Sequence, residues 1–235
     1  MRRSAAALAL VLLIASCASL RRPVDTLGAA TPAEAWAKLG DERASFAGAR
    51  AFLTVDPEGG RRFDATLSVD GRGRFALEGL SPLGTTLFGI YADGDRVLFT
   101  NERERTWWEG SFAEFVAGTG LFRGVDVETP ADLALILLGI PLDAGPLEGS
   151  WATAPSGLRY RVERTGLAEV LTQGNAARVL YLPAAYPPVR VVIEAEGSRL
   201  EIYHQEIVPG ETEVAIPQPD ASWTCCVLPR VVVGR

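Results

Sequence analysis

The sequence predicts a mainly β domain with a few helices, in which one curved antiparallel sheet packs helices inside its curve. Apolar and polar residues alternate along several runs, as in strands that bury one face. Turn signals recur about every 8–12 residues, which favours a sandwich or barrel-like sheet. Capped apolar segments interrupt the strands as helices. The 235 residues are enough for one sizeable domain behind an N-terminal leader.

Residues 1–16 have the pattern of a secretory signal peptide. Arg2 and Arg3 form its basic start, and the apolar run 5–15 is too short to cross a bilayer as a helix. The run ends at Cys17, and its small residues followed by cysteine resemble a bacterial lipobox, in which the cysteine is lipidated. The alternative is an ordinary signal peptide followed by a chance cysteine.

Residues 17–30 are interpreted as a lipidated N-terminus and a tether. Two or three acyl chains hold a protein durably on a membrane, whereas one chain binds only marginally. The remainder of the sequence therefore needs no membrane-spanning helix. Residue 18 is Ala rather than Asp, which in the common sorting rule of lipoproteins implies delivery to the outer membrane, facing the periplasm.

The charge balance narrows the range of partners. Removal of residues 1–16, with their two arginines, leaves 21 basic against 29 acidic side chains. Binding to nucleic acid requires a basic face, so we expect no nucleic-acid partner. No nucleotide-binding loop is present, no cofactor is expected, and we expect a monomer.

The first predicted helix runs over about 31–44. Thr31 suits the N-cap, Pro32 suits the first helical position, and Glu34 completes a capping box. A strand is predicted over 49–55. Further strands follow, with Asp-Gly turns at 70–71 and 93–94. Their predicted ranges are 63–69, 73–80, 85–92, 96–100 and 106–109.

The turn between the strands 73–80 and 85–92 has an unusual composition. Pro82 fixes its own φ and Gly84 can adopt a conformation closed to other residues, so Leu83 is held at the tip. Such an apolar residue either packs under a neighbouring loop or is presented to something outside.

Two helical segments follow. One begins at a capping box, Ser111 to Glu114; the other opens at Thr129 and continues through 133–138. The second is apolar nearly all round, so it is either buried or faces a lipid-like environment. At about nine residues it is too short to span a membrane. It is interpreted either as a plug filling the curve of the sheet or as a lid over an apolar cavity.

Strands then resume to the end of the domain. The predicted ranges are 158–164, 167–171, 177–182, 189–193 and 200–202, with short edge pieces at 214–216 and 231–233. We place the domain at 31–207. The Pro-rich segment 208–235 is separate, and an added edge strand is one interpretation of it.

The lipobox, the capped first helix, the Pro82-Leu83-Gly84 turn and the helix end at 137–142 stand in one order. Over roughly residues 31–205 this resembles the outer-membrane lipoprotein receptors of the LolB type, within the LolA/LolB-like lipoprotein-carrier superfamily. The resemblance implies an unclosed β-barrel, helices as a lid, and an apolar cavity that takes acyl chains. The segment from Val208 onward has no counterpart in it.

The resemblance also implies the site. Leu83, between Pro82 and Gly84, matches the protruding residue that passes lipoproteins into the membrane. Implied partners are acylated lipoproteins and a periplasmic carrier. Trp107 and Trp108 either rim the cavity, rest at the lipid interface, or pack in the core with one ring exposed. The residues assigned to the cavity and its lid are Phe75, Leu77, Leu87, Leu133, Ile136, Leu137 and Trp108.

Two functions fit these observations. The first is an outer-membrane lipoprotein that binds acyl chains of lipoproteins and helps insert them. The second is a non-catalytic envelope scaffold or assembly accessory of the same fold, with a filled interior and a protein partner or another hydrophobic ligand. A hydrolase acting on envelope lipid is a remote third.

An enzyme is not expected. The one histidine, His204, is interpreted as a solvated strand residue, and 79–83 lacks the final glycine of a nucleophile elbow. Acidic residues do not cluster as metal ligands. Cys225 and Cys226 form either a strained vicinal disulfide, free thiols or a bond to another chain.

Overall fold

The computed structural model describes residues 26–119, 122, 125, 127–143, 145–195, 197–225 and 228. The predicted signal peptide, Cys17, most of the tether, Cys226 and the edge piece 231–233 lie outside these residues. The predicted fold class is confirmed: the described chain is one large curved sheet that is not closed into a barrel, with three α-helices.

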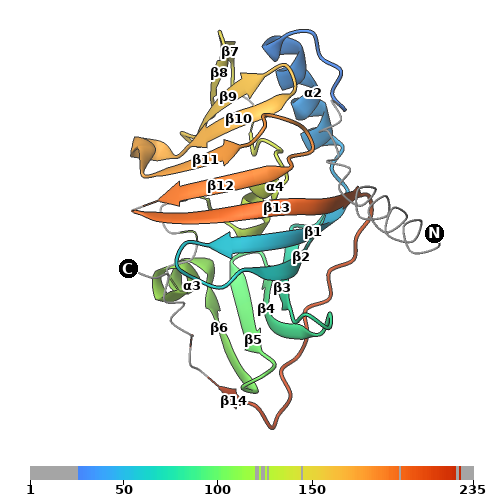
Figure 1. Ribbon diagram of the computed structural model, residues 1–235, viewed down its shortest axis with the longest axis vertical. Helices are drawn as coiled ribbons and strands as arrows, with labels where there is room; N and C mark the ends of the chain where they lie inside the picture. Colours follow the sequence, from blue (N-terminus) through green and yellow to red (C-terminus); the bar gives the residue numbers. More distant parts are fainter. Residues whose placement is uncertain are drawn as a thin grey trace, which may run out of the picture.

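All the strands belong to a single sheet, whose order runs β14-β6-β5-β4-β3-β2-β1-β13-β12-β11-β10-β9-β8-β7 (Figure 1). Neighbours pair antiparallel except β14, which pairs parallel with β6. The edges are β14 and β7, which are not paired with each other.

The strands of the first half of the sheet are β1 (Gly48–Pro57), β2 (Phe63–Asp70), β3 (Arg74–Leu80), β4 (Thr86–Asp93), β5 (Arg96–Asn101) and β6 (Thr106–Ser111). Those of the second half are β7 (Leu147–Glu148), β8 (Trp151–Thr153), β9 (Arg159–Glu163), β10 (Gly166–Leu171), β11 (Ala177–Tyr181), β12 (Arg190–Ala195), β13 (Ser198–Pro209) and β14 (Thr224–Cys225).

The helices are α2 (Pro32–Ala44), α3 (Phe112–Thr119) and α4 (Pro130–Leu137), with a 3₁₀ turn η1 (Gln173–Asn175). Thr31 caps α2, and Thr129 and Asp132 form the capping box of α4. Their side chains bond the backbone N–H groups that the first helical turn leaves unpaired. The helix starts expected from the sequence are therefore confirmed.

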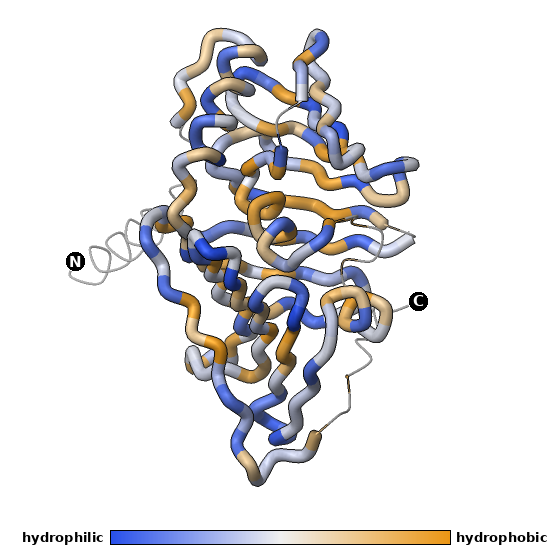
Figure 2. The backbone as a smooth tube through the Cα atoms, turned by 180° about the vertical axis from the view of Figure 1, so that it is seen from behind, coloured by the Kyte–Doolittle hydropathy of each residue, from blue (hydrophilic) through white to orange (hydrophobic). Residues whose placement is uncertain are grey.

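The hydrophobic core lies on the inner face of the curve. All residues of α4 from Leu133 to Leu137 are buried there. The Tyr181 hydroxyl donates to the Ile136 carbonyl at 2.7 Å, which ties α4 to β11. Viewed from behind, α4 lies over the middle of the sheet and is coloured hydrophobic (Figure 2). Of the two interpretations of this helix, the plug is the one the structure shows.

Charged side chains cover much of the outer face. Glu169 bonds both Arg161 and Arg178, and Glu201 bonds Arg190 and Arg199 across neighbouring strands. This explains the one-sided alternation of the sequence, since each strand presents apolar residues inward and polar residues outward.

The C-terminal segment 210–223 crosses the outer face and ends beside β6 as β14 (Figure 1). The predicted edge piece 214–216 is not a strand. Instead, Val214 is buried on the outer face in a cluster with Ala76, Tyr91 and Leu98. Its apolar residues therefore cover side chains of the sheet rather than extend the hydrogen-bonded ladder.

His204 differs from its expected solvated state. It lies on β13 opposite the buried Leu53, and both ring nitrogens are buried without a hydrogen-bond partner among the residues that the structure describes. Burial lowers the pKa of His204 to about 4. A β-bulge between Phe52 and Leu53 shifts the register here, which the sequence pattern did not reveal.

Candidate functional site: an apolar cavity beside the Leu83 turn

The turn that carries Leu83 is rigid. The Ser81 N–H donates to the Thr85 carbonyl and the Gly84 N–H to the Ser81 carbonyl, both at 2.8 Å. The Ser81 hydroxyl oxygen also accepts from the Leu83 and Thr85 N–H groups at 3.2 Å. Gly84 has φ +78°, a left-handed conformation that favours glycine. Leu83 is 92% exposed, so the turn presents it outward rather than packing it.

A cavity of about 270 Å³ lies between the inner face of the sheet and α3. Its floor is formed by inward side chains of β3, β4 and β5, namely Leu77, Ile90 and Phe99. Phe115 and Thr119 of α3 close it from the other side. The helix α3, rather than α4, is therefore the lid.

The cavity opens at one end of the strands. Its half-buried lining residues stand where strands end or begin: Pro57 on β1, Phe63 on β2, Phe88 on β4, Asn101 on β5 and Leu200 on β13. The deeper lining residues, one step back along the same strands, are buried.

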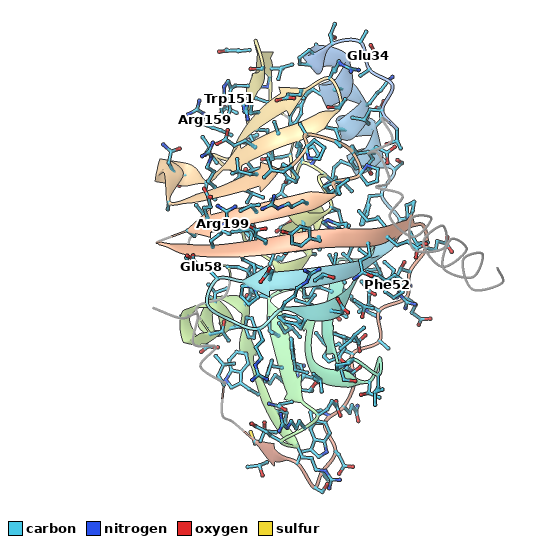
Figure 3. All side chains as sticks on the ribbon, in the orientation of Figure 1. Glu34, Phe52, Glu58, Trp151, Arg159 and Arg199 are labelled. Atoms are coloured by element: carbon cyan, nitrogen blue, oxygen red, sulfur yellow. The ribbon has the colours of Figure 1, made fainter. Side chains whose placement is uncertain are left out.

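The Leu83 turn lies at this same end. Leu80 pairs with both Asp64 and Thr86, so the turn 81–85 projects beside Phe63 and Phe88. Pro57 pairs with Leu200, and the Glu58 N–H donates to the Arg199 carbonyl at 2.9 Å. The labels of Glu58 and Arg199 mark this end of β1 and β13, opposite to Phe52 (Figure 3). The exposed Leu83 and the mouth of the cavity therefore lie at the same end of the strands.

Aromatic rings line the route inward. Phe63 packs edge-to-face on Phe88, with ring centroids 5.5 Å apart. Phe88 stacks on Phe99, which contacts Phe115 of the lid. Phe88 sits directly over Gly79, where an added Cβ would lie 2.2 Å from its ring. The glycine thus leaves the room in which this ring lies at the cavity wall.

Seven residues were predicted to belong to the cavity and its lid. Leu77 lines the cavity, and the other six lie elsewhere. Leu77 is part of the floor. Phe75 is buried farther along β3, and Leu133, Ile136 and Leu137 fill the core with at most 2% exposure. The assignments of these four to the cavity are corrected accordingly, because α4 plugs the curve instead of covering a space.

Leu87 and Trp108, the other two predicted residues, lie outside the cavity for separate reasons. Leu87 is 37% exposed on the outer face, since its neighbour Phe88 points inward. Trp108 is half-buried and packs on Phe115, behind the lid. Trp107 joins the outer-face cluster. Phe88 and Phe115, the inward aromatic residues of the cavity, were not predicted from the sequence.

The cavity wall has almost no polar surface. Among the described residues that line it none is ionisable, and the two polar ones are Asn101 and Thr119. The Thr119 hydroxyl donates to the Phe115 carbonyl at 2.7 Å. Such a space favours a hydrocarbon chain over any charged ligand, because burying an unpaired charge is costly.

No helix in the described part of the chain is long and apolar enough to cross a membrane. No group of three or more His, Cys, Asp or Glu residues is placed to hold a metal ion within the described ranges. Cys225 is disulfide-bonded, so it is not a free thiol; both other cysteines of the sequence lie outside the described residues.

No protein-family model and no curated protein matches the sequence. Solved structures do resemble the chain. One is a domain of a proposed outer membrane lipoprotein-sorting protein from Vibrio parahaemolyticus, with TM-score 0.47, 9% identity, and coverage of 76% of this chain and 93% of that one. Another is a LolA superfamily protein from Nitrosomonas europaea, with TM-score 0.37, 12% identity, and coverage of 76% and 93%.

A third is the lipoprotein LppX from Mycobacterium tuberculosis, with TM-score 0.30, 12% identity, and coverage of 73% of this chain and 92% of that one. The superfamily that the sequence resembles is thus represented among these structures. All three TM-scores lie under 0.5, so the similarity carries no conclusion about what this chain binds.

Proposed function

We propose that this chain is a lipid-anchored protein of the outer membrane, facing the periplasm, that binds acyl chains of lipoproteins and helps insert them into that membrane. The observation that carries the proposal is an apolar cavity, with no ionisable side chain among its described lining residues, that opens at the same end of the strands as the 92% exposed Leu83. Acylated lipoproteins and a periplasmic carrier are the proposed partners.

The size of the cavity limits what it holds. An engineered apolar cavity of about 150 Å³ binds benzene, so 270 Å³ corresponds to roughly eleven carbon atoms. At about 0.8 kcal/mol for each methylene, this burial contributes about 9 kcal/mol relative to water. Escape into water is therefore slow. Transfer between two apolar environments is nearly balanced, so the proposed function requires no nucleotide and no catalytic step.

A binding experiment tests the first half of the proposal. Every described helix, strand and core contact follows residue 25, so a chain that begins at Ala18 retains them and lacks Cys17. We expect this protein to take up a synthetic triacylated lipopeptide, measured by native mass spectrometry. Leu200→Trp fills the mouth and should abolish uptake, whereas Leu182→Trp, a change at an exposed residue away from the cavity, should not.

A transfer experiment tests the second half. Leu83→Glu should leave lipopeptide binding intact and slow its delivery to phospholipid vesicles. Val208→Glu places the same charge on an exposed apolar residue near the opposite end of β13, and it should transfer normally. Equal transfer by both variants would remove Leu83 from the mechanism. The alternative scaffold function predicts a filled interior, which the cavity disfavours.

A further inference from the structure

Asn101 brings a polar side chain to the mouth of an otherwise apolar cavity. It is the last residue of β5 and pairs with Phe88 on one side and Thr106 on the other. It is half-buried, and it lines the cavity. Its position therefore marks the level at which a chain inserted from the mouth leaves the apolar space.

The orientation of the Asn101 amide follows from its hydrogen bond. The backbone N–H of Glu104 donates to Asn101 Oδ1 at 3.1 Å. A backbone N–H needs an acceptor, so the oxygen is the atom that faces the 102–105 turn and Nδ2 is the other atom. No residue in the described part of the chain accepts a hydrogen bond from Nδ2. The hydroxyl of Thr119, the second polar lining residue, donates its hydrogen to the Phe115 carbonyl.

A free donor at the mouth suits the polar end of an acyl chain. Acyl chains of lipids and lipoproteins end in an ester or amide carbonyl, which accepts hydrogen bonds and carries no charge. We infer that the cavity takes one acyl chain of about ten to twelve carbons, and that Asn101 Nδ2 donates to the carbonyl of that chain at the mouth. This inference rests on the proposed function and adds to it a chain number, a chain length and a specificity-determining residue.

Chain length then decides whether the carbonyl reaches Asn101. A shorter chain leaves part of the cavity empty if its carbonyl stays at the mouth. A longer chain, such as one of sixteen carbons, inserts its distal part and keeps the carbonyl outside the mouth, beyond Asn101. The preference for the carbonyl is therefore greatest at the length that fills the cavity.

The test uses the chain that begins at Ala18 with saturated methyl esters of eight to sixteen carbons and the matching alkanes. Binding is followed at pH 7.5 by displacement of the fluorescent apolar probe N-phenyl-1-naphthylamine. Asn101→Asp keeps the oxygen that accepts from Glu104 and replaces the donor. Asn175→Asp is the matched control, because Asn175 lies in the exposed turn η1 and does not line the cavity.

We expect wild-type affinity for the esters to rise about fourfold with each methylene and to level off beyond about twelve carbons. Asn101→Asp should weaken the esters of ten to twelve carbons about three- to tenfold and leave alkanes unchanged. Asn175→Asp should match the wild type. An unbroken rise through sixteen carbons, or equal losses for esters and alkanes, overturns the inference.

Failure of the inference can be distinguished from failure of the proposed function. If the wild type binds the triacylated lipopeptide but Asn101→Asp matches Asn175→Asp, the inference is wrong and the proposed function stands. If the wild type binds neither lipopeptide, esters nor alkanes, the proposed function fails, and the inference fails with it.

Discussion

The buried imidazole of His204 makes the stability of the fold depend on pH. Its pKa is lowered from 6.5 to about 4 because burial penalises the charged form. No described residue accepts a hydrogen bond from either ring nitrogen. The unfolded chain therefore binds a proton at a higher pH than the folded chain does. Between these two pKa values the unfolded state holds more protons, so the free energy of unfolding falls as pH falls.

The size of the effect follows from the two pKa values. Each pKa unit corresponds to about 1.4 kcal/mol, so the contribution of His204 falls by about 2 kcal/mol from pH 7.5 to 5 and about 3 kcal/mol by pH 4. The sequence contains no other histidine. The pKa of the Glu201 carboxyl is lowered from 4.5 to about 2, mainly by the Tyr203 hydroxyl, so this group adds to the loss of stability only below about pH 5, where it becomes protonated in the unfolded chain.

Urea unfolding measures this prediction, followed by tryptophan fluorescence at pH 7.5, 6, 5 and 4. His204→Leu should lose the pH-dependent component and gain stability at every pH, because no polar atom is left unpaired. His204→Gln keeps a polar side chain and loses only the titration, so it separates the two effects. Parallel pH curves for the wild type and both variants would refute the reasoning.

Three further predictions concern the turn, the wall and the outer face. Gly84→Ala forces a β-carbon into φ +78° and should cost about 1–2 kcal/mol in urea unfolding, unless the turn 81–85 rearranges and Leu83 transfer falls instead. Gly79→Ala drives the Phe88 ring into the cavity and should weaken lipopeptide uptake about tenfold or more; unchanged uptake would show that the ring moves elsewhere. Val214→Ala should lower the free energy of unfolding by about 1–2 kcal/mol, and no change in urea midpoint would mean that segment 210–223 contributes nothing.

The sheet was predictable where one face is apolar and the other polar. Along β2, Ala65, Leu67 and Val69 alternate with Asp64, Thr66 and Ser68, and this parity alone assigns the inward face. The short strands β7, β8 and β14 have two or three residues each, too few to show a period. Segment 214–216 has strand-like composition, but its apolar side chains pack on the sheet and its backbone pairs with no strand.

The candidate site was less predictable, because residues that line it and their neighbours on the outer face are both apolar. Leu87 and Phe88 are adjacent and both hydrophobic, so composition does not reveal which one faces inward. The answer depends on the pairing of Phe88 with Gly79 and Asn101. His204 was missed for a related reason: a polar residue on an inner face contradicts the pattern, and only the three-dimensional register reveals it.

The distribution of helices over the concave face determines whether this fold contains a binding space. Over the middle of the sheet α4 is apolar on every side and fills the curve, held by the Tyr181 hydrogen bond. Near the start of β4 and the end of β5, α3 leaves a gap that the ring of Phe88, seated over Gly79, lines without filling. A sheet of this type with a second helix as fully buried as α4 in place of α3 would have a solid core. The space that we propose for an acyl chain therefore depends on how α3 covers this end of the strands and on one glycine opposite one phenylalanine, rather than on the curvature of the sheet.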